Sequence, residues 1–328
     1  MPIETSDAEN LHKRRESLKD VWKRYHDSFI DQKTDLLYEE KSFYRKCPIC
    51  KRNENTKQLF LKGGAIHDYC AACGIIFTRN LLLPDELNKY YENLPHLQNS
   101  FAECESEFYT RIYNLGIKKI SEALRKNKRD IEKVKLIDIG CSSGVFLTCA
   151  KNSGFSNPCG IELNNNDREI AKAKGFKVYG SDMKNIGQIF DLISLWDVFE
   201  HIPDGESFLN SHKKYLSKNG LIFMQIPSCE SLAARILREN CNVFDGIEHV
   251  NLYSEHSIKK LAELCGFELL HISDVITEEY PIMNFLNYED PYVPENNINK
   301  LNKINFMDKD ILIENGLGYK KQIILRIL

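Results

Sequence analysis

The sequence of 328 residues has no hydrophobic run near the roughly 20 residues that a membrane-spanning helix requires. Its first residues, MPIETSDAENLHKRRESLKD, lack the apolar segment of a secretory signal. The formal net charge is only −3, so the composition shows none of the basic excess typical of nucleic-acid-binding domains. We therefore expect a cytoplasmic globular protein without a membrane partner, and the charge balance disfavours a nucleic-acid partner, although a local basic patch stays open.

Cysteine is more abundant, with 11 residues, and four of them form two CxxC pairs. Cys47-Pro-Ile-Cys50 and Cys70-Ala-Ala-Cys73 have the spacing of a tetrahedral four-thiolate zinc site. A redox CxxC is the alternative, but two pairs in tandem favour a structural Zn²⁺ ion. His67 lies close enough in sequence to replace one cysteine ligand. We interpret the remaining cysteines as small hydrophobic residues.

The chain divides into segments of different character. Charged residues with apolar positions at helical spacing predict a helical N-terminal arm over residues 1–44. The cysteine pairs define a zinc-ribbon module at 45–80, and a helical connector follows at 81–130. Residues 131–328 form the predicted catalytic domain, in which an Asn- and Pro-rich stretch at 277–318 is an insertion or lid.

Within residues 131–328, strands and helices alternate at a regular period. We predict strands over 134–140, 158–163, 176–182, 190–198, 220–227, 267–273 and 321–328. Helices are predicted over 145–154, 167–175, 205–220 and 254–266. Such alternation implies an α/β fold with a doubly wound, mostly parallel sheet and helices on both faces.

A glycine-rich turn follows the first of these strands in LIDIGCSSGVFL. Gly140 permits a sharp turn, and Gly144 lets the backbone approach a ligand without a Cβ in the way. A dinucleotide site would need further glycines at the third and sixth positions, which are Ser142 and Val145 here. The spacing, with Asp138 two residues ahead, instead fits a cofactor made of adenosine and methionine.

Two carboxylates follow at the ends of the next two strands. Glu162 stands eighteen residues after Gly144, where a carboxylate can accept hydrogen bonds from both ribose hydroxyls. The alternative for Glu162 is a solvated strand end. Asp182 ends the third strand and is suited to the adenine amino group, although it could instead cap a helix.

These motifs, together with FDLISLWDVFEHIPD at 190–204, resemble those of class I S-adenosylmethionine-dependent methyltransferases over about residues 108–276 and the final strand. The resemblance implies a seven-stranded Rossmann-like methyltransferase sheet. It also implies that the loop binds the methionine end, the acid holds the ribose and the third-strand Asp faces adenine. The sequence departs from the pattern at Ser142, where a glycine is usual. The expected cofactor-binding residues are Asp138, Gly140, Cys141, Ser142, Gly144, Glu162, Leu163, Asp182, Met183 and Trp196.

Two histidines are candidates for the general base that removes a proton from the methyl acceptor. His201 follows the fourth strand, where it could also cap a helix or shape the pocket wall. His249 lies after the fifth strand, in a region that lines the acceptor side in similar enzymes, and its alternative is a structural role. Lesser candidates are Tyr253, His256 and, for the cofactor carboxylate, Arg111.

The order of the modules adds a second resemblance. The CxxC pairs with YCAACGIIFTRN and PDELNKYYEN resemble the N-terminal module of bacterial methyltransferases of sugar and polysaccharide biosynthesis. This implies a methyltransferase acting on a small molecule, such as a nucleotide-linked sugar or a glycan-pathway intermediate. Two alternatives stay open: an RNA methyltransferase that holds its substrate with the zinc ribbon, and an inactive zinc-ribbon scaffold.

Overall fold

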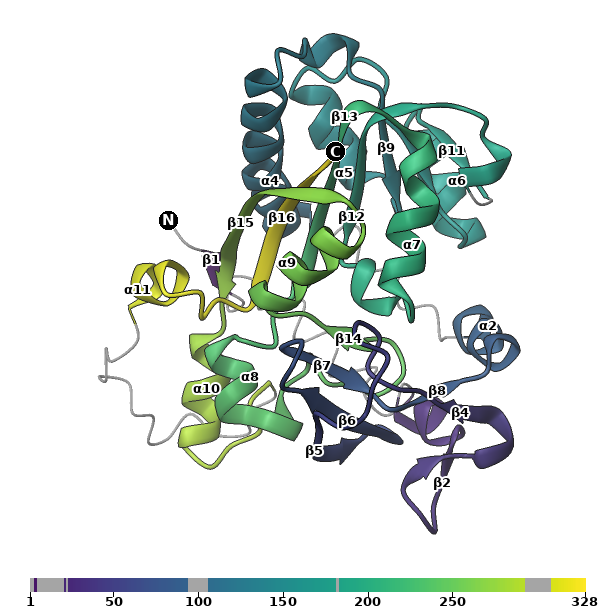
Figure 1. Ribbon diagram of the computed structural model, residues 1–328, viewed down its shortest axis with the longest axis vertical. Coiled ribbons are helices and arrows are strands. Elements are labelled where there is room, and N and C mark those ends of the chain that lie inside the picture. Colours follow the sequence, from purple (N-terminus) through teal and green to yellow (C-terminus); the bar gives the residue numbers. More distant parts are fainter. Residues whose placement is uncertain (1–2, 5–20, 22, 94–105, 181–182, 293–307) are drawn as a thin grey trace.

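The computed structural model describes residues 3–4, 21, 23–93, 106–180, 183–292 and 308–328. Figure 1 shows a large sheet with helices on both faces and a smaller sheet beside one end of it. In the described residues, no helix is both long and apolar enough to cross a membrane.

The large sheet contains the seven predicted strands and one more. Its order is β1-β15-β16-β13-β12-β9-β10-β11, in which β16 runs antiparallel to both neighbours and all other pairs are parallel. This confirms the Rossmann-like, doubly wound α/β fold, to which β1 adds an edge strand. The strands are β1 (Ile3–Glu4), β9 (Leu136–Ile139), β10 (Cys159–Ile161), β11 (Lys177–Tyr179), β12 (Phe190–Trp196), β13 (Leu216–Pro227), β15 (Phe267–Thr277) and β16 (Lys320–Ile327).

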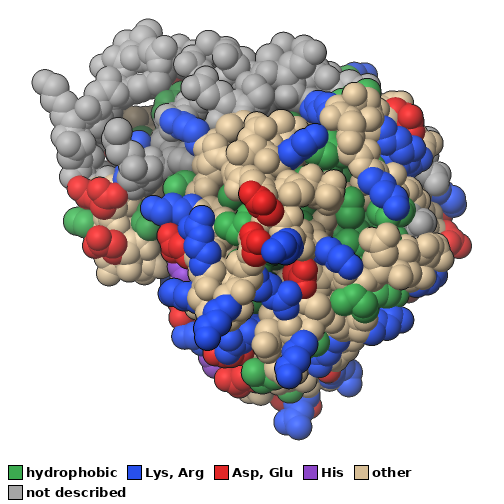
Figure 2. Space-filling model, turned by 90° about the horizontal axis from the view of Figure 1, so that it is seen from above, with side chains coloured by type: hydrophobic (Ala, Val, Ile, Leu, Met, Phe, Trp, Pro, Cys, Tyr) green, Lys and Arg blue, Asp and Glu red, His purple; other side chains and the backbone are tan. Residues whose placement is uncertain are grey.

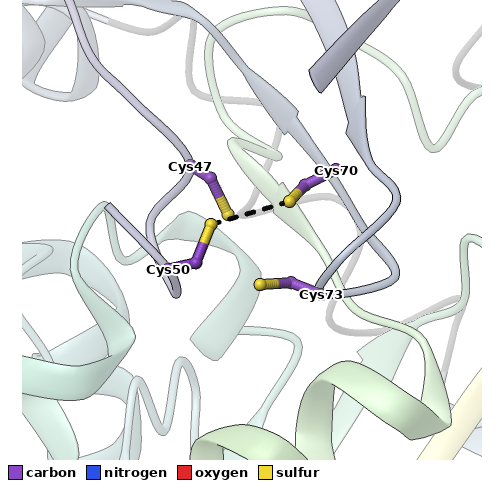
Figure 3. Close-up of side chains that lie close together, drawn as sticks. All are labelled: Cys47, Cys50, Cys70 and Cys73. Atoms are coloured by element: carbon purple, nitrogen blue, oxygen red, sulfur yellow. Dashed lines mark hydrogen bonds between the residues drawn. The ribbon is translucent and has the colours of Figure 1, made fainter. Parts of the chain in front are cut away.

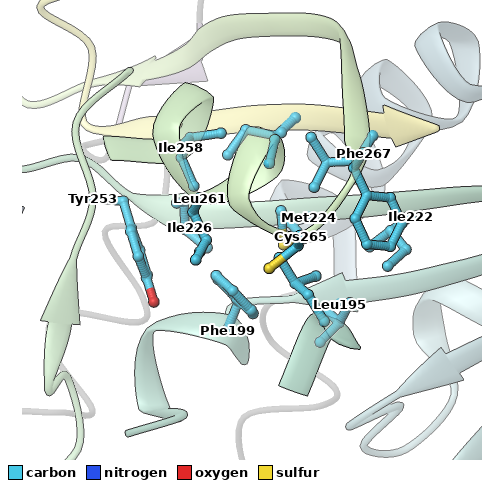
Figure 4. Close-up of a cluster of buried hydrophobic side chains, with 14 of the residues drawn as sticks. Leu195, Phe199, Ile222, Met224, Ile226, Tyr253, Ile258, Leu261, Cys265 and Phe267 are labelled. Carbon is cyan, nitrogen blue, oxygen red and sulfur yellow. The ribbon is translucent and has the colours of Figure 1, made fainter. Parts of the chain in front are cut away.

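Side chains alternate across the sheet, so each strand presents apolar residues on both faces, and helices cover both faces. Along β13, Leu221 and Phe223 pack on one face with the helices α4 (Ser106–Lys126), α5 (Val145–Asn152) and α6 (Asn165–Ala173). Ile222 and Met224 pack on the other face with α7 (Gly205–His212) and α9 (Glu255–Leu264), as Figure 4 shows for α9. Both faces are therefore buried, as a sheet of parallel strands requires.

The helix predicted over 205–220 is shorter than expected. α7 ends at His212, a 3₁₀ turn follows at Lys213–Tyr215, and β13 begins at Leu216. Leu216 pairs with Phe190 of β12, and its side chain is buried in the core. Strand pairing and burial therefore outweigh the helical pattern of this segment.

The cysteine-rich segment is part of a second, four-stranded sheet with the order β14-β7-β6-β5. The strands β5 (Thr56–Lys62), β6 (Ala65–Cys70) and β7 (Ile75–Thr78) form an antiparallel meander. The fourth strand, β14 (Asn251–Leu252), comes from the segment after β13 and pairs with β7. The small sheet therefore joins two parts of the chain that are far apart in sequence.

The described part of the N-terminal arm differs from the predicted helices. Helical residues end at 27, and 30–37 form a hairpin of β2 (Ile30–Asp31) and β3 (Leu36–Leu37). Asp35 has a φ of 57°, as a tight turn allows for aspartate. The hairpin packs against α2 (Pro84–Asn93), and β4 (Ser42–Tyr44) pairs with β8 (Asn80–Leu82).

The predicted insertion at 277–318 contains two helices in its described part, α10 (Glu279–Leu286) and α11 (Lys309–Glu314). Ile282 of α10 and Leu312 of α11 join a hydrophobic cluster with α8 (Leu232–Leu237) and Ile76 of the small sheet. The segment is thus packed against both the catalytic domain and the small sheet (Figure 1).

Candidate functional site

The glycine-rich turn after β9 contains three residues in the left-handed region. The φ angles are 75° at Gly140, 46° at Ser142 and 80° at Gly144, which caps the N-terminus of α5. The amide of Gly140 donates to the carbonyl of Ile161, with an N–O distance of 2.9 Å. A Cβ at position 140 would lie 2.7 Å from Cγ2 of Val198, and the positive φ also favours glycine at this position.

Glu162, at the end of β10, is fixed by this turn. Its Oε2 accepts a hydrogen bond from the Ser142 amide at 2.8 Å, and its Oε1 accepts one from the Asn164 amide at 2.7 Å. Burial raises the pKa of this carboxyl group above its usual value. Each oxygen of a carboxylate has two lone pairs, so both oxygens retain capacity for ligand hydroxyl groups.

The other predicted residues of the cofactor site lie at different depths around the turn. Asp138 is buried beneath it and accepts a hydrogen bond from Ser194 Oγ at 2.6 Å, while burial raises its pKa. Cys141 and Met183 are also buried, whereas 74% of Leu163 is exposed. Asp138 lies within β9, and Cys141, Leu163 and Met183 follow the carboxyl ends of β9, β10 and β11, the usual position of ligand sites in open α/β sheets.

Asp182 and Trp196 are the two remaining residues of the predicted cofactor site. Asp182 lies outside the described residues. Trp196 ends β12, and its ring packs inside the core at 4.5–5.0 Å from the rings of Tyr113, Phe146 and Phe223. The structure therefore places the Trp196 ring among aromatic packing residues, and its role toward the cofactor stays a prediction.

The turn and its carboxylate fit the cofactor that the fold family implies. Gly140 and Gly144 let the turn pack closely on Val198 and Ala171, and Glu162 is oriented to accept hydrogen bonds from hydroxyl groups. Bound there, S-adenosylmethionine would supply a methyl group on a positively charged sulfur.

His201 and His249 come together beyond the carboxyl end of β12. Their ring centroids are 5.0 Å apart with an interplanar angle of 77°, and the Val250 amide donates to the Glu200 carbonyl. Glu200 is fully buried, and its Oε1 lies 4.0 Å from Nε2 of His201. Among the described residues, neither carboxylate oxygen of Glu200 has a hydrogen-bond partner. Burial raises the pKa of Glu200 well above its usual value.

Oxygen atoms hold both imidazole rings through Nδ1. In His249, Nδ1 lies 3.0 Å from the Val243 carbonyl and 3.1 Å from Oδ2 of Asp245. In His201, Nδ1 lies 3.2 Å from the hydroxyl of Tyr91. Burial lowers the pKa of His201 to about 3, so this ring is neutral at physiological pH. An Nδ1–H bonded to oxygen leaves the Nε2 lone pair available for chemistry.

An ion pair near these histidines was not anticipated from the sequence. Lys320 of β16 lies 2.5 Å from Oδ2 of Asp197, which directly follows β12 and has a φ of 54°. The position of Asp197 at a strand end was a usable signal in the sequence. Lys320 had no such signal, because only the antiparallel register of β16 on β13 brings it to this edge.

The lesser candidates do not belong to the cluster of His201 and His249. Tyr253 is buried in the core, while His256 and Arg111 are exposed. His67 is buried in β6 with its ring 5.0 Å from that of Phe60, and among the described residues neither ring nitrogen has a partner.

The four cysteines of the CxxC pairs converge at one end of the small sheet (Figure 3). One sulfur from each of Cys47, Cys50, Cys70 and Cys73 lies within 4.8 Å of all the others, and the Cys50–Cys70 distance is 3.8 Å. Two ligands of a tetrahedral zinc ion with bonds of about 2.3 Å are about 3.8 Å apart. The cluster therefore fits a zinc ion.

Known proteins with related sequences are methyltransferases. The chain is 28% identical over 109 residues to the ubiquinone biosynthesis O-methyltransferase of Pelagibacter ubique, which covers 31% of this chain and 45% of that protein. It is 24% identical over 144 residues to the Rickettsia prowazekii protein of the same name, covering 40% and 56%. The chain thus spans about half the length of the curated relatives that it matches.

Solved structures of similar fold include a plantazolicin methyltransferase in complex with SAH and a methyltransferase from Clostridium acetobutylicum. The first has a TM-score of 0.49 and 17% identity, covering 74% of this chain and 93% of its own. The second has a TM-score of 0.45 and 15% identity, covering 70% and 98%.

A family model described as a methyltransferase domain matches residues 107–272, just over half of the chain. The matched range contains the glycine-rich turn, Glu162 and both clustered histidines. The chain belongs to this family and is an S-adenosylmethionine-dependent methyltransferase.

Proposed function

We propose that the protein transfers a methyl group to an oxygen atom of a small molecule that enters beside His201 and His249. The observation that carries this proposal is the convergence of the two rings at the sheet edge that carries the glycine-rich turn. Val198, three residues before His201, is the residue that a Cβ at Gly140 would touch. The relatives named as O-methyltransferases support an oxygen acceptor.

S-adenosylmethionine supplies an electrophilic methyl group, and transfer to a hydroxyl forms a C–O bond, breaks the C–S bond and releases one proton from the acceptor. We assign to His201 and His249 the role of lowering the barrier to loss of that proton. Both rings are held through Nδ1, so each can present Nε2 to the acceptor. The proposed cofactor-binding residues are Asp138, Gly140, Cys141, Ser142, Gly144, Glu162, Leu163, Asp182, Met183 and Trp196.

For the acceptor we propose a nucleotide-linked sugar or a glycan-pathway intermediate. The support is the sequence resemblance of the zinc-ribbon module and the helix after it to bacterial methyltransferases of sugar biosynthesis. Figure 2 shows Lys and Arg side chains spread over one face of the molecule, with acidic and uncharged side chains between them. The net charge of −3 favours a small acceptor over an extended nucleic acid.

A panel of acceptors tests this proposal. The purified protein, with labelled S-adenosylmethionine, is incubated with nucleotide sugars, with polyhydroxylated aromatic compounds and with RNA. We expect labelled product from a nucleotide sugar, with loss of at least about 100-fold in kcat/KM for His249→Asn. Label appearing only in aromatic compounds would overturn the sugar acceptor. Label in RNA alone, or in no acceptor despite cofactor binding, would overturn the small-molecule function.

We also propose that residues 45–80 form a zinc-ribbon module in which Cys47, Cys50, Cys70 and Cys73 bind one structural Zn²⁺ ion. The convergence of the four sulfurs supports this assignment. All four ligand positions are filled by thiolates, so the ion would stabilise the small sheet without a position open to substrate.

A further inference from the structure

Glu200 is the least satisfied carboxylate in the described part of the chain. It is fully buried at the tip of the turn after β12, and among the described residues no group donates a hydrogen bond to either oxygen. The nearby cation, Lys320, lies 2.5 Å from Asp197 and is held there. Buried carboxylates are normally paired with a cation, hydrogen-bonded or bound to a metal. The unpartnered oxygens of Glu200 therefore point to a ligand that binds there.

Two imidazole rings lie close to this carboxylate. One oxygen of Glu200 and one nitrogen from each of His201 and His249 all lie within 4.8 Å of one another. The Oε1–Nε2 distance between Glu200 and His201 is 4.0 Å. Ligands of a cation with bonds of about 2.1 Å lie roughly 3.0–3.5 Å apart, so movements of less than about 1 Å would close the set.

The second contacts of both histidines match those of metal ligands. Ligating histidines usually donate the N–H of their other ring nitrogen to a carboxylate, a backbone carbonyl or a water molecule. Nδ1 of His249 meets Asp245 and a backbone carbonyl, and Nδ1 of His201 meets Tyr91. These contacts fix both rings with Nε2 free to bind.

The charge around the cluster also favours a cation. Glu200, Asp245 and Asp197 contribute three carboxyl groups, and Lys320 contributes one ammonium group. Two imidazoles and one carboxylate leave coordination positions open, a set that suits Zn²⁺, Mn²⁺ or Fe²⁺.

We propose that Glu200, His201 and His249 bind a divalent cation whose open positions receive the acceptor oxygen. The role toward the acceptor rests on the proposed function, whereas the cation site stands on its own. A hydroxyl bound to a divalent cation loses its proton to water more readily, and the resulting oxygen anion is the better nucleophile. His201 and His249 would then act on the acceptor as ligands of the cation.

Titration with Mn²⁺ followed by electron paramagnetic resonance tests the site in the full chain. Mn²⁺ prefers oxygen and imidazole ligands and binds thiolate sites poorly, so the zinc-loaded cysteine cluster does not interfere. We expect one bound Mn²⁺ per chain. Glu200→Gln and His249→Asn should each weaken Mn²⁺ binding at least about 10-fold. The matched control, Glu263→Gln on the exposed side of α9, should bind Mn²⁺ like the wild type.

Thermal unfolding of each variant shows whether it is folded. Absence of Mn²⁺ binding to the wild type, or unchanged binding to a folded Glu200→Gln variant, would overturn the cation site. Addition of an acceptor that the enzyme methylates should change the Mn²⁺ spectrum. An unchanged spectrum would overturn the role of the cation toward the acceptor. Mn²⁺ binding without methylation of any acceptor would support the cation site and count against the proposed function.

Discussion

At the scale of single residues, the proposed cofactor site depends on the carboxylate of Glu162, which two backbone amides hold in place. Glu162 accepts hydrogen bonds from the amides of Ser142 and Asn164, so its oxygens are oriented before any ligand arrives. Such preorganisation reduces the entropy that binding must overcome. The position of Glu162 was predictable from its place after a buried strand, but its contact with Ser142 was not.

Replacement of Glu162 by Gln should weaken binding of S-adenosylmethionine by about 10–100-fold, because hydrogen bonds to a charged group contribute about 1.5–3 kcal/mol. Isothermal titration calorimetry measures the change. Glu169→Gln is a matched control, since Glu169 is exposed on α6 and pairs with Lys172. Equal affinity of the Glu162→Gln variant and the wild type would remove Glu162 from the cofactor site.

His67 should make stability sensitive to acid. Burial lowers the pKa of this histidine to about 4, below the value of about 6.5 expected in the unfolded chain. The unfolded state therefore binds the proton first, and the contribution of His67 to stability is lost as the pH falls from about 6.5 to 4. The loss amounts to up to about 3 kcal/mol.

The variant His67→Phe preserves aromatic packing against Phe60 and Phe244 and removes the titrating group. Denaturant unfolding at several pH values should show a smaller loss of stability between pH 6.5 and 4 than in the wild type. An identical slope in the two proteins would contradict the burial argument.

At the scale of elements, the small sheet and the catalytic domain meet at two glycines. A Cβ at Gly246 would lie 2.5 Å from the Gly63 carbonyl oxygen and 2.6 Å from that of Lys62. The turn at Gly246 directly follows Asp245, which holds His249. A second junction lies nearby, where β14 pairs with β7 of the small sheet (Figure 1).

Gly246→Ala should lower the free energy of unfolding by about 2 kcal/mol or more, because backbone atoms must move to admit the new Cβ. Gly175→Ala is the matched control: its φ of 88° imposes the same kind of strain, but a Cβ there meets nothing within 4 Å. We expect about 1 kcal/mol for the control. Equal losses in both variants by chemical denaturation would show that the contact between the segments is not tight.

At the scale of the whole molecule, the cysteine cluster belongs to the same core as the large sheet. Cys47, Cys70 and Cys73 are fully buried in one hydrophobic cluster with residues of β12, β13 and α9. The small sheet is completed by β14, so its loss would expose part of the catalytic domain.

Removal of the proposed zinc ion should therefore destabilise the entire chain. We expect a chelator, or the Cys70→Ser variant, to lower Tm by roughly 10 °C or more in a single transition. Calorimetry and zinc analysis measure both effects. Cys265→Ser is the control, because Cys265 is buried in the same hydrophobic core but is not one of the four converging thiols, so its variant should retain one zinc per chain. Two separate transitions would show that the small sheet unfolds independently.

The sequence by itself determined the order of strands and helices, the glycine-rich turn, Glu162 and the spacing of the cysteine pairs. These features depend on local preferences: alternation of apolar residues, the freedom of glycine and the geometry of a CxxC turn. The tertiary structure alone decided that His201 meets His249, that Glu200 is buried without a partner and that Lys320 pairs with Asp197. It also decided the early end of α7, because the pairing of Leu216 with Phe190 outweighed the local helical pattern. The hairpin at 30–37 is a local pairing, and Ile30 and Leu37 are buried against Tyr90 of α2. Contacts between segments far apart in sequence arise only when the sheet order and strand register are set.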